Sequence, residues 1–227
     1  MFSTRRRILI AVPAALLALG AGLFAVLRFT DDRPDEPPAA TRVVQPGAPG
    51  QAGRTLSPAE QSKLPPPPAH TGADVQFMQG MIAHHAQALE MTALVSDRAE
   101  NPEVSLLAGR IQASQRDETA LMERWLTERG AQLPGPHTHH AGHDALMPGM
   151  LTPEQMSQLR QARGREFDRL FLDFMIRHHN GALTMVQQLY AAGGGLEPEA
   201  DRFAREVNAD QAIEIRSMRE LLAKLSG

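Results

Sequence analysis

Hydrophobic positions recur at intervals of three and four residues through most of the chain from Gly72 onward. This spacing is typical of helices that bury one face, and no segment shows the alternation of a strand. Capping residues, prolines at helix starts and glycines at helix ends divide the pattern into separate elements. We expect long helices at about 73–98, 102–129, 165–191 and 198–225, and a short helix that begins at Thr152-Pro153-Glu154.

The second half of this region repeats the first. A shift of 94 residues superimposes His84-His85 on His178-His179, together with the surrounding Asp, Phe, Met, Ile, Ala and Leu positions. A shift of 96 residues does the same for the following helix, where Gln115, Glu118 and Met122 fall on Gln211, Glu214 and Met218. Residues 72–227 are therefore predicted to be an all-α domain, a ferritin-like four-helix bundle built from two αα-hairpins at about 73–129 and 165–225.

The N-terminal residues have a different composition. Arg5, Arg6 and Arg7 precede an uncharged apolar run from Ile8 to Leu27, which as a helix of about 30 Å is long enough to span a bilayer. We interpret residues 1–30 as a transmembrane signal anchor, with a cleaved signal peptide as the alternative. The arginines place the N-terminus in the cytoplasm and the domain outside, in the periplasm or at the cell surface, or secreted if the segment is cleaved. Residues 31–71 are rich in proline, and we expect a disordered linker there.

Charge and cysteine content narrow the chemistry. Residues 31–227 hold 19 basic and 26 acidic residues, a formal charge of −7, which argues against a nucleic-acid partner. The chain has no cysteine, so a soft metal ion would have to be held by methionine and histidine rather than by thiolate.

Paired histidines with a methionine one turn away are the leading candidate site. Met81 lies within one helical turn of both His84 and His85, so a thioether and an imidazole can reach the same point. Neutral imidazole and thioether ligands together favour copper(I) or silver(I) over hard ions. The alternative is ordinary packing, because buried histidines and methionines are common in cores. The predicted metal ligands are Met81, His84, His85, Met91, Met175, His178, His179 and Met185.

Two further sets of residues could contribute to the site. Possible ligands or groups that orient the histidines are Asp74, Asp168, Glu118, Glu214, Met122 and Met218. The alternative for the two aspartates is a first-turn acid that favours the helix dipole, and the alternative for the two glutamates is an exposed, salt-bridged side chain. Asp74 lies about 16 Å from His85 along the helix axis, so the two cannot bind one ion within a single helix. The loop at 131–151 could capture metal through His137, His139, His140, His143, Met147 and Met150, or be a polar connector.

These motifs together resemble the bacterial family known as domain of unknown function 305. The resemblance rests on Asp74, Phe77, Met81-Ile82, His84-His85, Ala88 and Met91, on their repeat from Phe167-Asp168 to Met185, and on Met147-Pro148-Gly149-Met150-Leu151-Thr152. It covers residues 72–226, with no departure at the hallmark positions. The resemblance implies a ferritin-like fold, exported members, and roles in copper or silver binding and tolerance.

The functional prediction is an extracytoplasmic binding protein without turnover, which sequesters or hands over a metal ion, copper in the first place. The first alternative is a ferritin-like di-metal oxidoreductase, but the Glu-x-x-His motif of those sites is absent from the sequence. The second is a helical interaction module that binds no metal. The metal ion and, through the N-terminal helix, the membrane are the expected partners, and the sequence names no protein partner.

Overall fold

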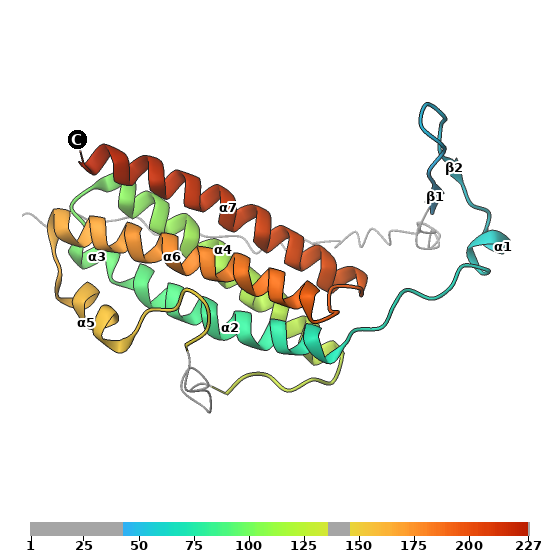
Figure 1. Cartoon of the computed structure of the whole chain (residues 1–227), viewed down its shortest axis with the longest axis horizontal. Helices are drawn as coiled ribbons and strands as arrows, with labels where there is room; N and C mark the ends of the chain where they lie inside the picture. Colours follow the sequence, from blue (N-terminus) through green and yellow to red (C-terminus); the bar gives the residue numbers. More distant parts are fainter. Residues whose placement is uncertain (1–42, 136–145, 227) are drawn as a thin grey trace, which may run out of the picture. The chain divides into compact units, whose positions relative to one another are not determined.

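The computed structural model describes residues 43–135 and 146–226 of the 227-residue chain (Figure 1). The chain divides into two compact units, one that ends at Leu64 and one that begins at Pro65. The predicted signal anchor at 1–30 and the loop histidines at 137–143 lie outside the described residues.

The described part of the first unit holds three short elements. Strands β1 (Val44–Gln45) and β2 (Arg54–Thr55) pair antiparallel, and α1 (Pro58–Gln61) follows them. These elements lie within residues 31–71, for which the sequence predicts a disordered linker. The chain reverses between the strands through a proline- and glycine-rich turn, in which Gly50 adopts a φ of 84° that favours glycine.

The second unit is entirely helical in its described part. The four long helices predicted from the spacing are present, but the first one is divided at Leu94. There the N–H of Leu94 bonds to the carbonyl of Met91 three residues back, which tightens the turn and ends the regular helix. The elements are α2 (Gly72–Ala93), α3 (Val95–Arg98), α4 (Pro102–Glu128), α5 (Pro153–Gln161), α6 (Gly164–Ala191) and α7 (Pro198–Ser226).

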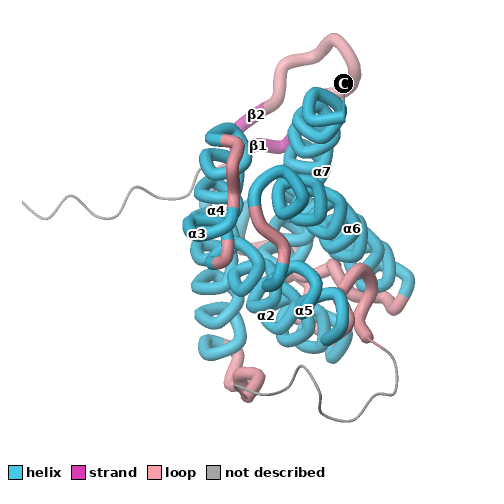
Figure 2. Tube along the Cα trace, turned by 90° about the vertical axis from the view of Figure 1, so that its left-hand side faces the viewer, coloured by secondary structure: helices cyan, strands magenta, loops and turns pink. Residues whose placement is uncertain are grey.

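The long helices lie side by side (Figures 1 and 2). α2 packs along α4 and α6, and α6 packs along α7, whereas α4 and α7 touch over a shorter stretch. Short α5 packs on α6 and completes the connection from the first hairpin to the second. Two hairpins therefore meet mainly through α2 and α6, the two helices that carry the paired histidines.

The core consists of two apolar clusters separated by a polar layer. One cluster contains Leu107 of α4 and Phe171 of α6, and the other contains Trp125 of α4 and Leu189 of α6. On each long helix, buried polar side chains lie between the residues of the two clusters. We call these the polar layer: His84 and His85 on α2, Gln115 on α4, His178 and His179 on α6, and Gln211 on α7.

Within residues 43–135 and 146–226, no helix combines the length and the apolar character that crossing a membrane requires. The membrane anchor expected from the sequence remains a prediction for residues 1–30.

Candidate metal centre

His84 and His178 form the centre of the polar layer. Their ring centroids lie 3.7 Å apart with an angle of 33° between the planes, and neither side chain is exposed. The Nε2 of His178 bonds to the backbone carbonyl of His84 at 3.0 Å, and the Nε2 of His84 bonds to the carbonyl of Pro148 at 3.1 Å. The two rings therefore join α2 to α6 at equivalent positions of the two repeats.

His85 and His179 point from the same layer toward the outer helices. The Nε2 of His85 bonds to the Glu118 carboxylate of α4 at 2.6 Å, and the Nε2 of His179 bonds to the Glu214 carboxylate of α7 at 2.6 Å. A carboxylate that holds one ring nitrogen fixes the orientation of an imidazole and is common behind metal-binding histidines. Each repeat thus supplies the same histidine–glutamate pair.

The second nitrogen of every one of these rings is free of hydrogen bonds. In the described part of the chain, the buried Nδ1 atoms of all four histidines have no partner. A carbonyl or carboxylate acceptor requires the proton on Nε2, so a neutral ring carries its lone pair on Nδ1. Burial, together with neighbouring His85, lowers the pKa of His84 to about 3 despite its bond to Pro148, and burial among the other histidines lowers the pKa of His178 well below its usual value. The central pair is therefore neutral at physiological pH and presents two nitrogen lone pairs.

Carboxylates gather where α4 approaches α7. Burial raises the pKa of Asp210, and the nearby carboxylates of Glu118, Glu214 and Glu206 raise it further. Burial also opposes ionisation of Glu118, but its hydrogen bonds from His85 and Ser114 leave its pKa lowered overall. Carboxylates therefore border the layer on one side, and a cation bound there would relieve their mutual repulsion.

Gln115 and Gln211 belong to the layer although the sequence did not mark them as site residues. Each is 1% exposed, and the Oε1 atom of each is buried without a hydrogen-bond partner among the described residues. Their repetition at a shift of 96 residues was visible in the sequence, but their burial was not. A buried polar atom without a partner costs about 1–3 kcal/mol, so two amide oxygens and four imidazole nitrogens of this kind in one layer call for a function.

The methionines predicted as ligands or supporting groups all lie in the two apolar clusters. Met81 and Met175, fully buried, lie one turn before the histidines on α2 and α6. Met122 and Met218 are also fully buried, one turn beyond Glu118 and Glu214. Met91 packs in the cluster that contains Phe171, and Met185 packs in the cluster that contains Trp125. Met81 and Met175 are therefore the buried methionines nearest in sequence to the paired histidines.

Asp74 and Asp168 are bound to backbone N–H groups away from the layer. Asp74 accepts hydrogen bonds from Thr71 N at 2.6 Å and from Gly195 N at 2.6 Å, in the connection that leads to α7. Asp168 accepts hydrogen bonds from Asn101 N at 2.8 Å and Glu100 N at 3.3 Å, at the start of α4. Each aspartate thus ties its own hairpin to the other one.

Residues 146–152, at the end of the central loop, lie across α2 and α6, and we call this segment the strap. The side-chain amide of Gln87 exchanges two hydrogen bonds with the backbone of Leu151, at 2.7 and 3.0 Å. On α6, Gly181 lies so close to Pro148 that a Cβ atom there would overlap the Pro148 carbonyl. That carbonyl is the acceptor for His84, so the strap holds the central pair in place.

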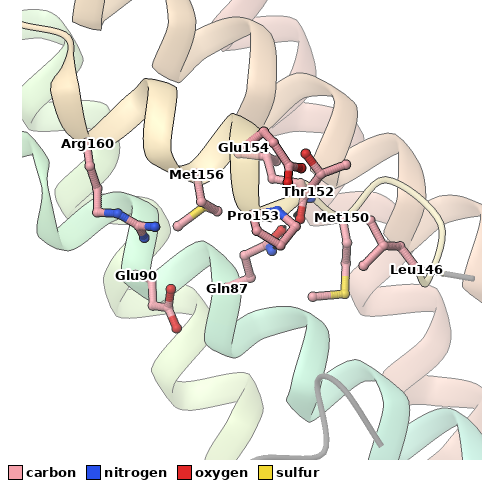
Figure 3. Close-up of a pocket in the computed structure, with 10 residues that line it drawn as sticks. Gln87, Glu90, Leu146, Met150, Thr152, Pro153, Glu154, Met156 and Arg160 are labelled. Carbon is pink, nitrogen blue, oxygen red and sulfur yellow. Dashed lines mark hydrogen bonds between the residues drawn. The ribbon is translucent and has the colours of Figure 1, made fainter. Parts of the chain in front are cut away.

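The two methionines of the strap face different cavities. Met150 lines a cavity of about 480 Å³, which has Glu90 and Arg160 at one end and Leu146 at the other (Figure 3). Met147 lines a different cavity of about 250 Å³, together with Gly80 of α2 and Met185 of α6. Neither cavity is lined by the paired histidines, so the structure separates the loop methionines from the polar layer and from each other.

The donor set in the layer fits a soft metal ion. Among the described residues, no three His, Asp or Glu side chains come together in a group that could hold a metal ion. The acids Glu118 and Glu214 are engaged with histidine nitrogens, whereas imidazole Nδ1 atoms and thioether sulfurs remain. Imidazole and thioether are the ligands that copper(I) accepts and that hard ions disfavour.

The domain is a helical bundle of two hairpins that share one buried layer of paired histidines. The family pattern described as "Domain of unknown function (DUF305)" matches residues 74–222. The chain belongs to the DUF305 family.

Solved structures of several relatives have the same fold. A DUF305 fragment from Deinococcus radiodurans is 34% identical, with a TM-score of 0.61 over 69% of this chain and 99% of its own. A DUF305 protein from Streptomyces coelicolor, described as a proposed secreted protein, is 30% identical with a TM-score of 0.60, over 68% of this chain and 94% of its own. CopM in its Cu(II)-bound form is 28% identical with a TM-score of 0.56, over 66% of this chain and 96% of its own.

CopM has also been solved with Cu(I) and with silver. Among curated proteins, the uncharacterized protein L153 of Acanthamoeba polyphaga mimivirus is 37% identical over 59 residues. That match spans 26% of this chain and 39% of the viral protein.

Proposed function

We propose that the domain binds a soft monovalent metal ion, copper(I) or silver(I), in the polar layer. The observation that carries the proposal is the set of four buried imidazoles whose Nε2 atoms are held by acceptors and whose Nδ1 atoms have no partner among the described residues. Met81 and Met175 supply the thioethers from the turns that precede the histidine pairs.

The residues that surround the histidines support a soft ion. The chain contains no cysteine, and the two nearest carboxylates already orient His85 and His179. CopM, which shares the fold, is solved with Cu(II), Cu(I) and silver. The similarity to CopM favours a protein that sequesters or hands over copper rather than a di-metal oxidoreductase.

We place the domain outside the cytoplasm, with residues 1–30 as its membrane anchor. The support is the apolar run that follows Arg5–Arg7 and the likeness to the Streptomyces coelicolor protein described as a proposed secreted protein. Fractionation of cells that express the full chain tests this: the protein is expected with the membranes, and recovery in the cytosolic fraction would contradict it.

The test of the metal proposal is a competition titration of the full chain with Cu(I) against a chromophoric Cu(I) chelator. The variants are Met81→Leu, His84→Gln and His85→Gln, each checked for helical content by circular dichroism. We expect each histidine variant to lose Cu(I) affinity by at least about tenfold, since each removes a nitrogen ligand.

The matched control is His70→Gln, because His70 is exposed and contacts the edge of the Trp125 ring outside the polar layer. His70→Gln is expected to leave affinity and stoichiometry unchanged. If the folded His84→Gln and His85→Gln variants bind Cu(I) like the wild-type chain, the polar layer is not the site.

A further inference from the structure

Two methionine side chains that are far apart in the sequence meet above Gly80 of α2. A Cβ atom at Gly80 would lie 3.4 Å from the Cε of Met185 and 3.7 Å from the Sδ of Met147. Met185 belongs to α6 and Met147 to the strap, so three segments converge at this point. The missing side chain of Gly80 leaves the room that the two thioethers border.

This room is the cavity of about 250 Å³ that Met147 lines. Its wall includes the amides of Gln76 and Gln188, but none of the described residues that line it carries a charge or an imidazole. Met147 is partly exposed and Met185 is 7% exposed, whereas Met81 and Met175 have no exposed surface. A site of this chemistry rejects hard divalent ions and accepts a soft monovalent one.

At the matching place of the second repeat, a large side chain stands where Gly80 leaves room. The position that matches Gly80 at the shift of 94 residues is Phe174, and the position that matches Met185 is Met91. Phe174 packs against the apolar cluster in which Met91 is fully buried. A glycine in a helix interior costs about 0.5–1 kcal/mol relative to alanine, so Gly80 is a stability loss that keeps this cavity open.

We propose that Met147 and Met185 form a second site, which captures Cu(I) or Ag(I) from solution before the ion reaches the histidines. This inference rests on the function proposed above. Two thioethers leave coordination positions open, so the ion remains exchangeable. Met147 is followed in the sequence by Pro148, whose carbonyl accepts the hydrogen bond from His84. The capture site is therefore next to a residue that contacts the central pair.

The experiment uses the full chain labelled with ¹³C at the methionine ε-methyl groups and titrated with Ag(I) and, under anaerobic conditions, with Cu(I). We expect the methyl signals of Met147 and Met185 to shift together, with the first equivalent of ion or as a separate step. Met147→Leu and Met185→Leu are each expected to lower the Cu(I) stoichiometry by one equivalent in the chelator competition. Zn(II) is expected to shift neither signal.

Two further variants keep the test independent of folding. Gly80→Phe copies the residue of the other repeat, fills the cavity without removing a thioether, and is expected to lose the same equivalent. Met156→Leu removes a thioether from α5, outside this cavity, and is expected to keep full stoichiometry.

The outcomes separate this site from the histidine centre. If the wild-type chain binds Cu(I) but neither methyl signal shifts and the Leu and Phe variants keep every equivalent, the second site is wrong and the histidine centre stands. If the wild-type chain binds no Cu(I) at all, both proposals fall. Loss of one equivalent in His84→Gln with the Met147 and Met185 shifts retained supports two separate sites.

Discussion

At the residue scale, the direction in which each imidazole presents its lone pair depends on what its Nε2 proton meets. Backbone carbonyls hold His84 and His178, and glutamates hold His85 and His179. The second pair gives the clearest test of whether these contacts tune a metal centre, because a carboxylate raises the basicity of the imidazole while an amide of the same shape does not.

Glu118→Gln is therefore expected to weaken Cu(I) binding about 10- to 100-fold while the helices remain folded. The affinity from chelator competition is the measurement. Because Glu214 makes the same contact in the other repeat, Glu214→Gln should weaken binding to a comparable extent. Glu123→Gln is the control, since Glu123 is exposed on the same helix as Glu118. An unchanged affinity in both Glu118→Gln and Glu214→Gln would show that the glutamates do not act on the metal.

Gly181→Ala should destabilise the domain by about 1–3 kcal/mol, because the added Cβ overlaps the Pro148 carbonyl and forces the strap away from α6. The free energy of unfolding in urea measures this effect. The matched control is Gly109→Ala on α4, where a Cβ would meet no atom within 4 Å. That control is expected to gain about 0.5–1 kcal/mol from lower chain entropy. Equal gains in both variants would mean that the strap does not depend on contact with Gly181.

At the scale of helices and connections, the hairpins are held together by reciprocal capping as well as by packing. Asp74 near the start of α2 binds the connection that precedes α7, and Asp168 near the start of α6 binds the connection that precedes α4. Both carboxylates are almost fully buried. This exchange fixes the axial position of α2 against α6, which sets how closely His84 and His178 approach.

Asp74→Ala and Asp168→Ala are each expected to lower the free energy of unfolding by about 1–3 kcal/mol, since each removes a buried carboxylate that accepts two backbone hydrogen bonds. Cu(I) stoichiometry is expected to stay unchanged in both. Asp117→Ala, at an exposed position of α4, is the control for the loss of an acidic side chain. The capping role would be refuted by a variant that keeps full stability and loses an equivalent of Cu(I).

Much of this architecture is predictable from the sequence, because the spacing of apolar residues, the helix caps and the 94-residue repeat are local or periodic features. The division at Leu94 was not predicted, since it depends on a single hydrogen bond to Met91. For the site, the repeat identified the paired histidines and Glu118 with Glu214. It could not indicate which ring nitrogen is engaged, that Gln115 lies buried in the same layer, or that Met147 and Met150 face different cavities. Those properties depend on contacts between segments that are 33 to 94 residues apart in the sequence.

At the scale of the whole molecule, both repeats contribute to one polar layer, so an ion bound there stabilises the folded state of the entire bundle. The layer carries six buried polar atoms without partners among the described residues. Ligands that bind only the folded state raise its stability according to their concentration and affinity.

Saturation with Ag(I), which undergoes no redox change here, is therefore expected to raise the free energy of unfolding. The gain is about 4 kcal/mol when free Ag(I) is a thousand times its dissociation constant. A thermal melt followed by circular dichroism measures the effect, and removal of the ion with a strong chelator should restore the lower midpoint. The double variant His84→Gln and His178→Gln should lose most of the gain. Identical midpoints with and without Ag(I) in the wild-type chain would exclude binding in the core.

The strap crosses only one side of an otherwise twofold arrangement. His84 donates to Pro148, whereas the matching His178 donates to the backbone of His84. The two halves are therefore chemically distinct despite their shared ancestry as duplicated sequence. In a nitrogen-15 NMR spectrum, the ring nitrogens of the two central histidines would appear as two sets of resonances of equal intensity. If two ions entered the layer, the two halves would bind them with different affinities.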